Sequence, residues 1–259
     1  MRASVSQIKQ FKACRRAWYF KYHEKLMPVE SAEPLETGRS YHQYLEALED
    51  GVEPGYDFSK AAAMAKAYEK YILPKFKVVA TEKEYEKIIG NHTLHGFVDG
   101  IADDGCIVEH KTTSRDISEG GEYEYNLLWD EQVLAYMSLT GARKVYYTVC
   151  RKPTIRLKKD ESEEDFFDRM VAWYDEDTDS KIRMFVVERT DAEIAQFEQD
   201  FEAICDEMDG CKNTYRNCLH CNSWGRRCEY SSICLNYNPD QQYIEFTKGD
   251  QSDGGGEEF

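Results

Sequence analysis

Two carboxylates and one lysine form the most informative pattern in this sequence. Asp99 lies in GFVDGI, and Glu109 and Lys111 follow in IVEHKTT. Apolar residues flank all three, so a carboxylate that is buried here needs a partner that offsets its loss of water. Mg²⁺ or Mn²⁺ is such a partner, because these cations prefer oxygen ligands and activate water for phosphodiester hydrolysis. The pattern predicts a metal-dependent site in which Lys111 orients or helps to deprotonate the attacking water.

A meander of short strands is predicted to carry these residues. Runs rich in β-branched and aromatic residues alternate with Gly, Asn and Asp pairs that favour tight turns. Glu109 and Lys111 then project from the same face of one strand, and Asp99 lies close to them if its strand is the antiparallel neighbour. The three runs are residues 85–89, 93–99 and 106–111.

Helices and two further strands are predicted around this meander. Ser6 is expected to cap the first helix, which carries Cys14, and a helix that starts near Thr37 carries His42. Thr190 and Glu193 form a capping box at the start of a long helix. Helices are expected over residues 6–22, from about 37, and over 59–72, 126–139, 163–174 and 190–208, and strands over 144–150 and 181–187. The order of elements predicts an α/β (α+β) fold, a central mixed β-sheet flanked by helices.

Cysteines are unusually frequent, with nine in the chain. Five of them lie between Cys211 and Cys234, and such clustering is more typical of metal binding than of a disulfide frame. Cys218 and Cys221 are spaced as a common ligand pair, so either of them could bind a metal ion. Four thiolates would suit tetrahedral zinc as well as an iron-sulfur cluster.

The motifs and their order resemble a known superfamily. GFVDGI with IVEHKTT resembles motifs II and III of the PD-(D/E)XK nucleases, and GRSYHQYLE and DEQVLAYM resemble two further motifs of the RecB-like exonuclease branch. The resemblance covers roughly residues 4–235 and implies a restriction-endonuclease-like core. It also implies that His42, Asp99 and Glu109 bind Mg²⁺ or Mn²⁺, that Asp99, Glu109 and Lys111 are catalytic, and that Gln132 and Tyr136 position DNA.

The cysteines extend this resemblance. SVSQIKQFKACRRAWYFKY and the late cysteines are similar to the one-plus-three pattern of iron-sulfur nucleases, which include the helicase-nuclease subunit AddB, CRISPR-associated four-cysteine exonucleases and phage exonucleases. The resemblance implies a four-iron four-sulfur cluster that joins the first and last segments, with zinc as the alternative. Cys221 is preferred to Cys218 because the residues after it have the phage-like spacing. The implied ligands are Cys14, Cys221, Cys228 and Cys234.

One nuclease domain is expected over residues 1–235, with 1–30 and 211–235 as its cysteine-cluster subregion. Residues 236–259 form an extension whose end, GDQSDGGGEEF, is acidic and glycine-rich. This end is predicted to be a mobile tail, and it is a candidate docking segment for a recombination or replication protein.

The net charge of −16 would by itself disfavour nucleic acid as a partner, but basic residues are concentrated in two segments. Residues 2–25 and 143–159 each contain seven Lys and Arg, and both are candidate walls of a path for DNA, single-stranded or with duplex ends. No apolar run is long enough to predict a membrane span, and the start lacks a secretory signal. The expected location is the cytoplasm, or the host cytoplasm if the protein is viral.

The sequence therefore predicts a metal-dependent DNA exonuclease of recombination, repair or phage DNA processing. One alternative is a nuclease that trims DNA ends during CRISPR adaptation. The other is a non-catalytic iron-sulfur subunit that binds DNA. Binding of a divalent cation distinguishes the first two functions from the last.

Overall fold

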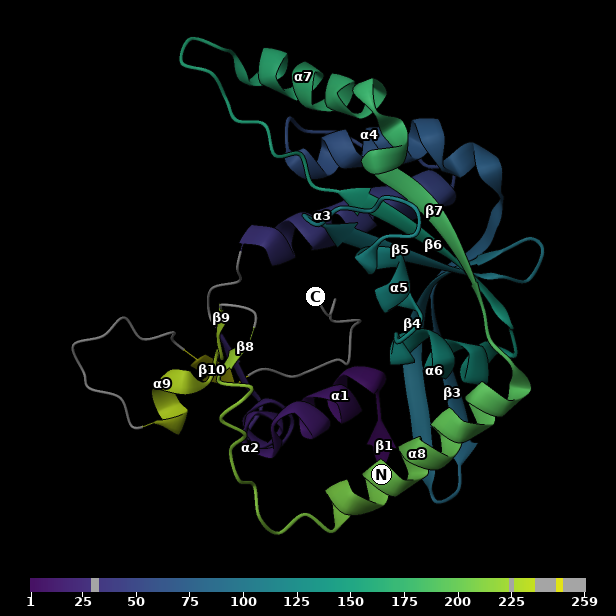
Figure 1. Cartoon of the computed structure of the whole chain (residues 1–259), viewed down its shortest axis with the longest axis vertical. Coiled ribbons are helices and arrows are strands. Elements are labelled where there is room, and N and C mark those ends of the chain that lie inside the picture. Colours follow the sequence, from purple (N-terminus) through teal and green to yellow (C-terminus); the bar gives the residue numbers. More distant parts are fainter. Residues whose placement is uncertain (29–32, 224–225, 236–245, 249–259) are drawn as a thin grey trace. The chain divides into compact units, whose positions relative to one another are not determined.

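The computed structural model describes residues 1–28, 33–223, 226–235 and 246–248 (Figure 1). The chain divides into two compact units. The terminal unit comprises Met1–Ala32, Glu86–Gly96 and Gln196–Phe259, and the central unit comprises Glu33–Tyr85 and Phe97–Ala195. The single nuclease domain expected over residues 1–235 stays a prediction, and the acidic tail from residue 249 lies outside the described residues.

A mixed β-sheet of six strands confirms the predicted fold class. β4 and β5 are antiparallel, β5 and β6 are parallel, and β6 and β7 are antiparallel. In hydrogen-bonded order the strands are β1 (Arg2–Ala3), β4 (His92–Ala102), β5 (Ile107–Thr113), β6 (Lys144–Arg151) and β7 (Ile182–Glu188), and β3 (Val78–Ile89) pairs with β4.

Helices of the central unit cover both faces of β6, which explains why the run KVYYTVC is apolar without alternation. Val145, Tyr147 and Val149 pack in a core cluster with residues of α5 and α6. Cys150 points to the other face, into a cluster with residues of α3, α4 and α7. These helices are α3 (Glu33–Glu49), α4 (Lys60–Tyr71), α5 (Glu122–Leu127), α6 (Glu131–Thr140) and α7 (Glu163–Glu176).

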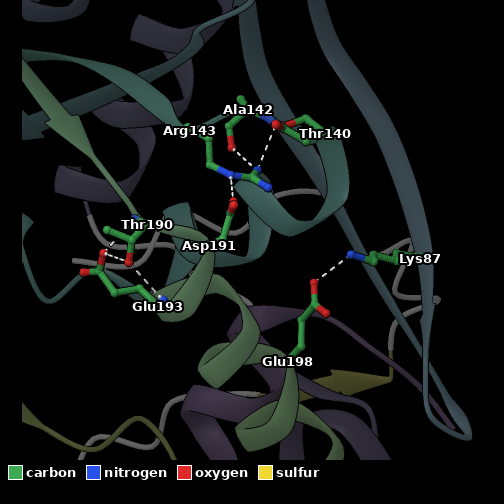
Figure 2. Close-up of polar contacts among 9 residues, drawn as sticks. Lys87, Thr140, Ala142, Arg143, Thr190, Asp191, Glu193 and Glu198 are labelled. Carbon is green, nitrogen blue, oxygen red and sulfur yellow. Dashed lines mark hydrogen bonds and ion pairs between the residues drawn. The ribbon is translucent and has the colours of Figure 1, made fainter.

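Two helix starts follow the sequence closely. Ser59 caps α4, and its hydroxyl accepts a hydrogen bond from the Ala62 amide at 3.1 Å. The predicted capping box opens α8 (Asp191–Asp209): the Thr190 amide donates to Glu193 Oε2 at 2.8 Å, and the Glu193 amide donates to Thr190 Oγ1 at 3.2 Å (Figure 2). Side chains in the box satisfy amides that have no partner within the helix.

The prediction of one helix over residues 6–22 is wrong. α1 (Val5–Ala13) ends at Cys14, whose φ of −161° and ψ of 110° are extended, and α2 (Arg15–Trp18) begins directly after it. A π-helical turn over Tyr19–His23 follows. The cap is Ser4 rather than Ser6. Apolar spacing does not reveal this break because buried residues continue on both sides of Cys14.

The helix expected over residues 126–139 is also interrupted. α5 ends at Leu127, and Asp130 caps α6 by accepting a hydrogen bond from the Gln132 amide at 3.0 Å. The expected strand at 85–89 is longer, since β3 begins at Val78. The break at Asp130 fixes the position of a carboxylate that contacts Lys111.

Short elements complete the described parts of the chain. In the terminal unit β2 (Leu26–Pro28) pairs with β10 (Phe246–Lys248), β8 (Asn222–Ser223) pairs with β9 (Arg226–Arg227), and α9 covers Ser231–Cys234. In the central unit 3₁₀ turns cover Leu73–Lys75 and Thr178–Ser180.

None of the described helices has both the length and the apolar character that a membrane crossing requires.

One basic segment proposed as a DNA wall is partly used for internal contacts. Arg143 donates to Asp191 Oδ1 at 2.5 Å and to the carbonyl oxygens of Gly141 and Ala142 at 2.8 and 2.9 Å (Figure 2). Lys144 lies 2.9 Å from a carboxylate oxygen of Glu188. These two bases secure the ends of β6 and β7, so only the rest of the segment remains a candidate for phosphate contacts.

Candidate active site

β4 and β5 bring the predicted carboxylates together. Their antiparallel register places Gly100 opposite Val108. The backbone amide of His110 donates a hydrogen bond of 2.8 Å to Asp99 Oδ2. Asp99 is thus fixed against the strand that carries Glu109, as the sequence pattern predicted.

His42 reaches Asp99 from α3. Its Nδ1 lies 3.9 Å from Asp99 Oδ2, and both side chains are largely buried. The fully buried Tyr41 and Leu45 anchor this part of α3 in the core. The helix therefore holds the imidazole beside the carboxylate, where both can bind one cation.

Glu82 is a third member of this group, and the sequence analysis missed it. Ligand atoms of His42, Glu82 and Asp99 all lie within 4.8 Å of one another. Glu82 is exposed as a residue, but desolvation of its carboxyl group and the charge of Asp99 raise its pKa to about 7. Its φ of +41° lies in the left-handed region, which is uncommon for a residue with a side chain.

No local signal could have identified Glu82. It lies in TEKEYEKI, where acids and lysines alternate as they do on any solvated strand. Its role follows from a backbone angle and from contacts with residues distant in sequence, neither of which is visible in the spacing.

Glu109 is the most deeply buried carboxylate of the site, with 2% of its side chain exposed. Its Oε1 lies 2.8 Å from Lys111 Nζ, whereas Oε2 has no hydrogen-bond partner among the residues that the structure describes. Burial and the charge of Asp99 raise the pKa of Glu109 to about 7, against the opposing effect of Lys111. A buried oxygen without a partner is costly, and a bound cation would remove that cost.

Lys111 is surrounded by acceptors. Its Nζ lies 2.8 Å from Glu109 and 3.7 Å from Asp130, and it donates to Gln132 Oε1 at 2.7 Å. Burial lowers the pKa of Lys111, but the charges of Glu109 and Asp130 outweigh burial and raise the pKa overall. An ammonium group has three protons to donate, so these contacts fix its position as well as its charge.

Asp130 is a second residue that the sequence analysis missed. One carboxylate oxygen caps α6, and the other accepts a hydrogen bond of 3.1 Å from the Tyr147 hydroxyl. The helix start and the position of Lys111 therefore depend on the same carboxylate. Asp before a helix is a readable capping signal, but its second contact is not.

Gln132 and Tyr136 lie on the same side of α6, as their spacing predicted. Gln132 Nε2 donates to the Tyr136 hydroxyl at 2.9 Å, while its Oε1 accepts from Lys111. Tyr136 is only 5% exposed and belongs to the core cluster between the sheet and α6. Tyr136 thus orients Gln132, and a DNA-positioning role for the pair stays a prediction.

The other face of β5 carries a buried polar network. His110 is 4% exposed, and its Nε2 lies 3.1 Å from a carboxylate oxygen of Glu49. Its Nδ1 lies 2.7 Å from Thr148 Oγ1, and the Tyr68 hydroxyl donates to Glu49. Burial is the largest single effect and lowers the pKa of His110, but the charge and hydrogen bond of Glu49 together with the charge of Asp99 raise it overall. This network fixes the strand segment whose amide holds Asp99.

The predicted metal ligands fit a hard divalent cation. His42 and Asp99 belong to one group with Glu82, and Glu109 is linked to that group through the charge of Asp99. Carboxylate oxygens with one imidazole suit Mn²⁺ or Mg²⁺. Asp99, Glu109 and Lys111 lie on the neighbouring strands β4 and β5, and His42 reaches Asp99 from α3, but Glu109 is not a member of the group that His42, Glu82 and Asp99 form.

The predicted cysteine ligands line one pocket of the terminal unit. Its walls include Cys14, Cys221, Cys228 and Cys234. The Asn217 amide donates to Cys14 Sγ at 3.3 Å, and the Cys228 amide donates to the Cys221 carbonyl at 3.0 Å. Cys218 is exposed and is not among the residues that line the pocket.

Comparisons with known proteins agree with the site. The model of the PD-(D/E)XK nuclease superfamily matches residues 2–235. No curated protein matches the chain. A protein from Eubacterium rectale that was proposed to be an exonuclease has 13% identity and a TM-score of 0.53, with 93% of this chain and 90% of that chain covered.

Two further solved structures are less similar. An alkaline exonuclease from Laribacter hongkongensis has 13% identity and a TM-score of 0.37, with 81% of this chain and 88% of that chain covered. A phage-related exonuclease from Haemophilus somnus has 14% identity and a TM-score of 0.39, with 80% and 92% covered. The family match extends over nearly the whole chain and includes both strands of the site, so this protein belongs to the PD-(D/E)XK nuclease superfamily.

Proposed function

We propose that this protein is a Mg²⁺- or Mn²⁺-dependent deoxyribonuclease that digests DNA from its ends. One observation carries the proposal: the buried Glu109 Oε2, which has no partner in the described structure, lies on the same strand face as Lys111. A carboxylate in this position is costly unless it binds a cation. The adjoining group around Asp99 supplies the remaining ligands.

His42, Asp99 and Glu109 would hold the cation, with Glu82 as an additional ligand. When bound, the cation supplies Lewis-acid chemistry, since it polarises the phosphate and lowers the pKa of a water ligand. The protein fixes the geometry of these groups: the His110 amide holds Asp99, and the core of α3 holds His42. Little reorganisation is then needed when the substrate binds.

Lys111 acts as a donor and as a balancing charge. Glu109, Asp130 and Gln132 hold its ammonium group at the edge of the carboxylate cluster. A fixed ammonium group in this position can orient the attacking water and offset the negative charge that develops on the phosphate. Gln132, oriented by Tyr136, places DNA against this group.

Two arguments support DNA ends as the substrate. The motifs and their order resemble the RecB-like exonuclease branch, and the Eubacterium rectale protein was proposed to be an exonuclease. Recombination, repair or phage DNA processing is the pathway that this resemblance favours. Trimming of DNA ends in CRISPR adaptation is the alternative, and the complete set of His42, Asp99, Glu109 and Lys111 disfavours a non-catalytic subunit.

We further infer that the cysteine pocket holds a four-iron four-sulfur cluster. The four cysteines line one pocket, and four thiolates satisfy the ligand requirement of such a cluster. The resemblance of the cysteine pattern to the iron-sulfur nucleases favours the cluster, and tetrahedral zinc is the alternative.

Digestion of end-labelled single- and double-stranded DNA tests the nuclease proposal. Anaerobically purified protein is assayed with Mn²⁺, with Mg²⁺ and with EDTA, beside Lys111→Ala and the matched surface variant Lys75→Ala, which lies outside both basic segments. We expect cleavage that requires the cation, that Lys111→Ala abolishes and that Lys75→Ala retains. Folded protein that binds Mn²⁺ but leaves every substrate intact would contradict the proposal and favour the DNA-binding subunit.

Visible absorbance and metal analysis of the same preparation test the cluster. A brown protein with about four iron atoms per chain is expected for a four-iron cluster. A colourless protein that contains zinc would overturn the assignment without affecting the nuclease proposal.

A further inference from the structure

Two aromatic side chains are exposed where α5 ends: Tyr125 lies in α5, and Trp129 lies in the turn that leads to α6. Trp129 is 70% exposed and Tyr125 is 57% exposed, and Leu128 between them is 46% exposed. The two aromatic rings lie edge to face, with centroids 6.2 Å apart. Large apolar side chains gathered on a surface commonly mark a binding site.

The turn that carries these rings is firmly held. Arg189 is 9% exposed, and its guanidinium donates to the carbonyl oxygens of Leu127 and Leu128 at 3.4 and 2.5 Å. The Trp129 amide donates to the Asn126 carbonyl at 3.0 Å. The Leu127 side chain is buried in the core. A buried arginine and a core leucine therefore fix the backbone, so the exposed rings are displayed from a rigid support.

The exposed Trp129 is next in sequence to a residue that contacts Lys111. Trp129 is followed directly by Asp130, whose carboxylate lies 3.7 Å from Lys111 Nζ. Gln132, which accepts a hydrogen bond from the same ammonium group, is the second residue of α6. A ligand that lies on Trp129 and extends along the turn would reach the residues that position Lys111.

Acidic residues near the rings determine which part of DNA the rings can bind. Glu122 and Glu124 lie in α5, the helix that carries Tyr125, and their charges repel phosphates. A base presents a flat, uncharged face, and aromatic side chains stack on such faces without sequence preference. The turn thus suits a nucleobase and disfavours the DNA backbone.

We propose that Tyr125 and Trp129 form a stacking platform for unpaired bases next to the scissile phosphate. This proposal rests on the proposed nuclease function and deepens it, because a paired base cannot leave its stack to lie on the platform without unpairing. The substrate at this site is then a single strand, or a duplex end whose last base pairs have opened.

Equilibrium binding of a fluorescent single-stranded oligonucleotide tests the platform, with Ca²⁺ in place of Mn²⁺ to suppress cleavage. We expect Trp129→Ala to weaken binding by roughly five- to 100-fold, the value of one base stack. Trp129→Phe, which keeps a ring, restores most of the affinity. Phe58→Ala, at an aromatic residue of the central unit that is 52% exposed, is the matched control and leaves binding unchanged.

The salt dependence of binding separates stacking from charge. Because the platform contacts no phosphate, Trp129→Ala lowers affinity at every salt concentration and leaves the slope of log K against log salt unchanged. The proposal of a stacking platform would be overturned if Trp129→Ala bound single strands as tightly as the wild type. It would also be overturned if Trp129→Phe and Trp129→Ala bound them with equal affinity. The exposed rings would then serve a protein partner.

This outcome is distinguishable from failure of the nuclease proposal. If the wild-type protein neither binds nor cleaves DNA, the proposed function fails. If the wild-type protein binds and cleaves single strands and Trp129→Ala does both equally well, only the platform fails. Melting curves of each variant confirm that it is folded.

Discussion

At the scale of single residues, the site is a set of charges that compensate one another only in part. Lys111 neutralises one oxygen of Glu109, and the His110 amide satisfies one oxygen of Asp99. Glu82 places a further carboxyl group close to Asp99. The excess of carboxylates is the physical reason to expect a divalent cation here.

Glu82→Gln tests the ligand that sequence reasoning missed. The amide keeps the size of the side chain but removes its charge, so we expect Mn²⁺ to bind at least about tenfold more weakly. Calorimetric titration with Mn²⁺ measures this directly. Glu84→Gln, at an exposed position two residues further along β3, is the control, and equal affinities of both variants would exclude Glu82 as a ligand.

Asp130 caps α6 and contacts Lys111, and substitutions at this residue can separate these two roles. Asn caps helices as well as Asp does, so Asp130→Asn is expected to keep the thermal stability of the wild type. It removes a charge that holds Lys111, and we expect cleavage to fall by roughly ten- to 100-fold, as for other residues that support a metal site. Asp130→Ala should in addition lose about 1 kcal/mol of stability. Full activity of Asp130→Asn would show that Glu109 and Gln132 alone suffice to hold Lys111.

At the scale of elements, the sequence predicted strands and helix starts better than helix interruptions. β5, β6 and the capping box of α8 follow from alternation, β-branched content and a known cap motif. The breaks at Cys14 and Asp130 were missed because the apolar pattern continues across them. Both breaks place a side chain of a proposed site, and such sites are where local rules of helix formation are expected to fail.

The capping box offers a test of an element away from the site. Thr190→Ala removes the hydroxyl that accepts from the Glu193 amide, and we expect the free energy of unfolding to fall by about 1 kcal/mol. Cleavage should not change. Thr190→Ser, which retains the hydroxyl, is the control, and chemical denaturation measures both. Unchanged stability of Thr190→Ala would mean that water replaces the cap at no cost.

At the scale of the whole molecule, the family and the sheet could be predicted from the sequence, but the division into two units could not. The resemblance covered roughly residues 4–235, and the family model matches residues 2–235. The terminal unit is assembled from three separate segments, and nothing in their local composition indicates this. The cysteines alone suggested that the first and last segments belong together.

Cys14→Ser tests whether a metal holds the terminal unit together. Closing a loop of this length restricts the unfolded chain, so loss of the metal should lower the melting temperature and the iron content together. Cys218→Ser is the matched variant, and we expect it to retain both because Cys218 does not line the pocket. Loss of iron from Cys14→Ser without any change in melting would exclude a structural role.

The burial of β5 on both faces has a consequence for mutational tolerance. Glu109 and Lys111 contact each other on the face of the candidate active site, while His110 between them contacts Glu49 and Thr148 on the other face. An ordinary half-exposed strand accepts substitutions at every second position. In a saturation scan read out by nuclease activity, we expect residues 107–111 to accept almost none, so that this short stretch would show no alternation at all.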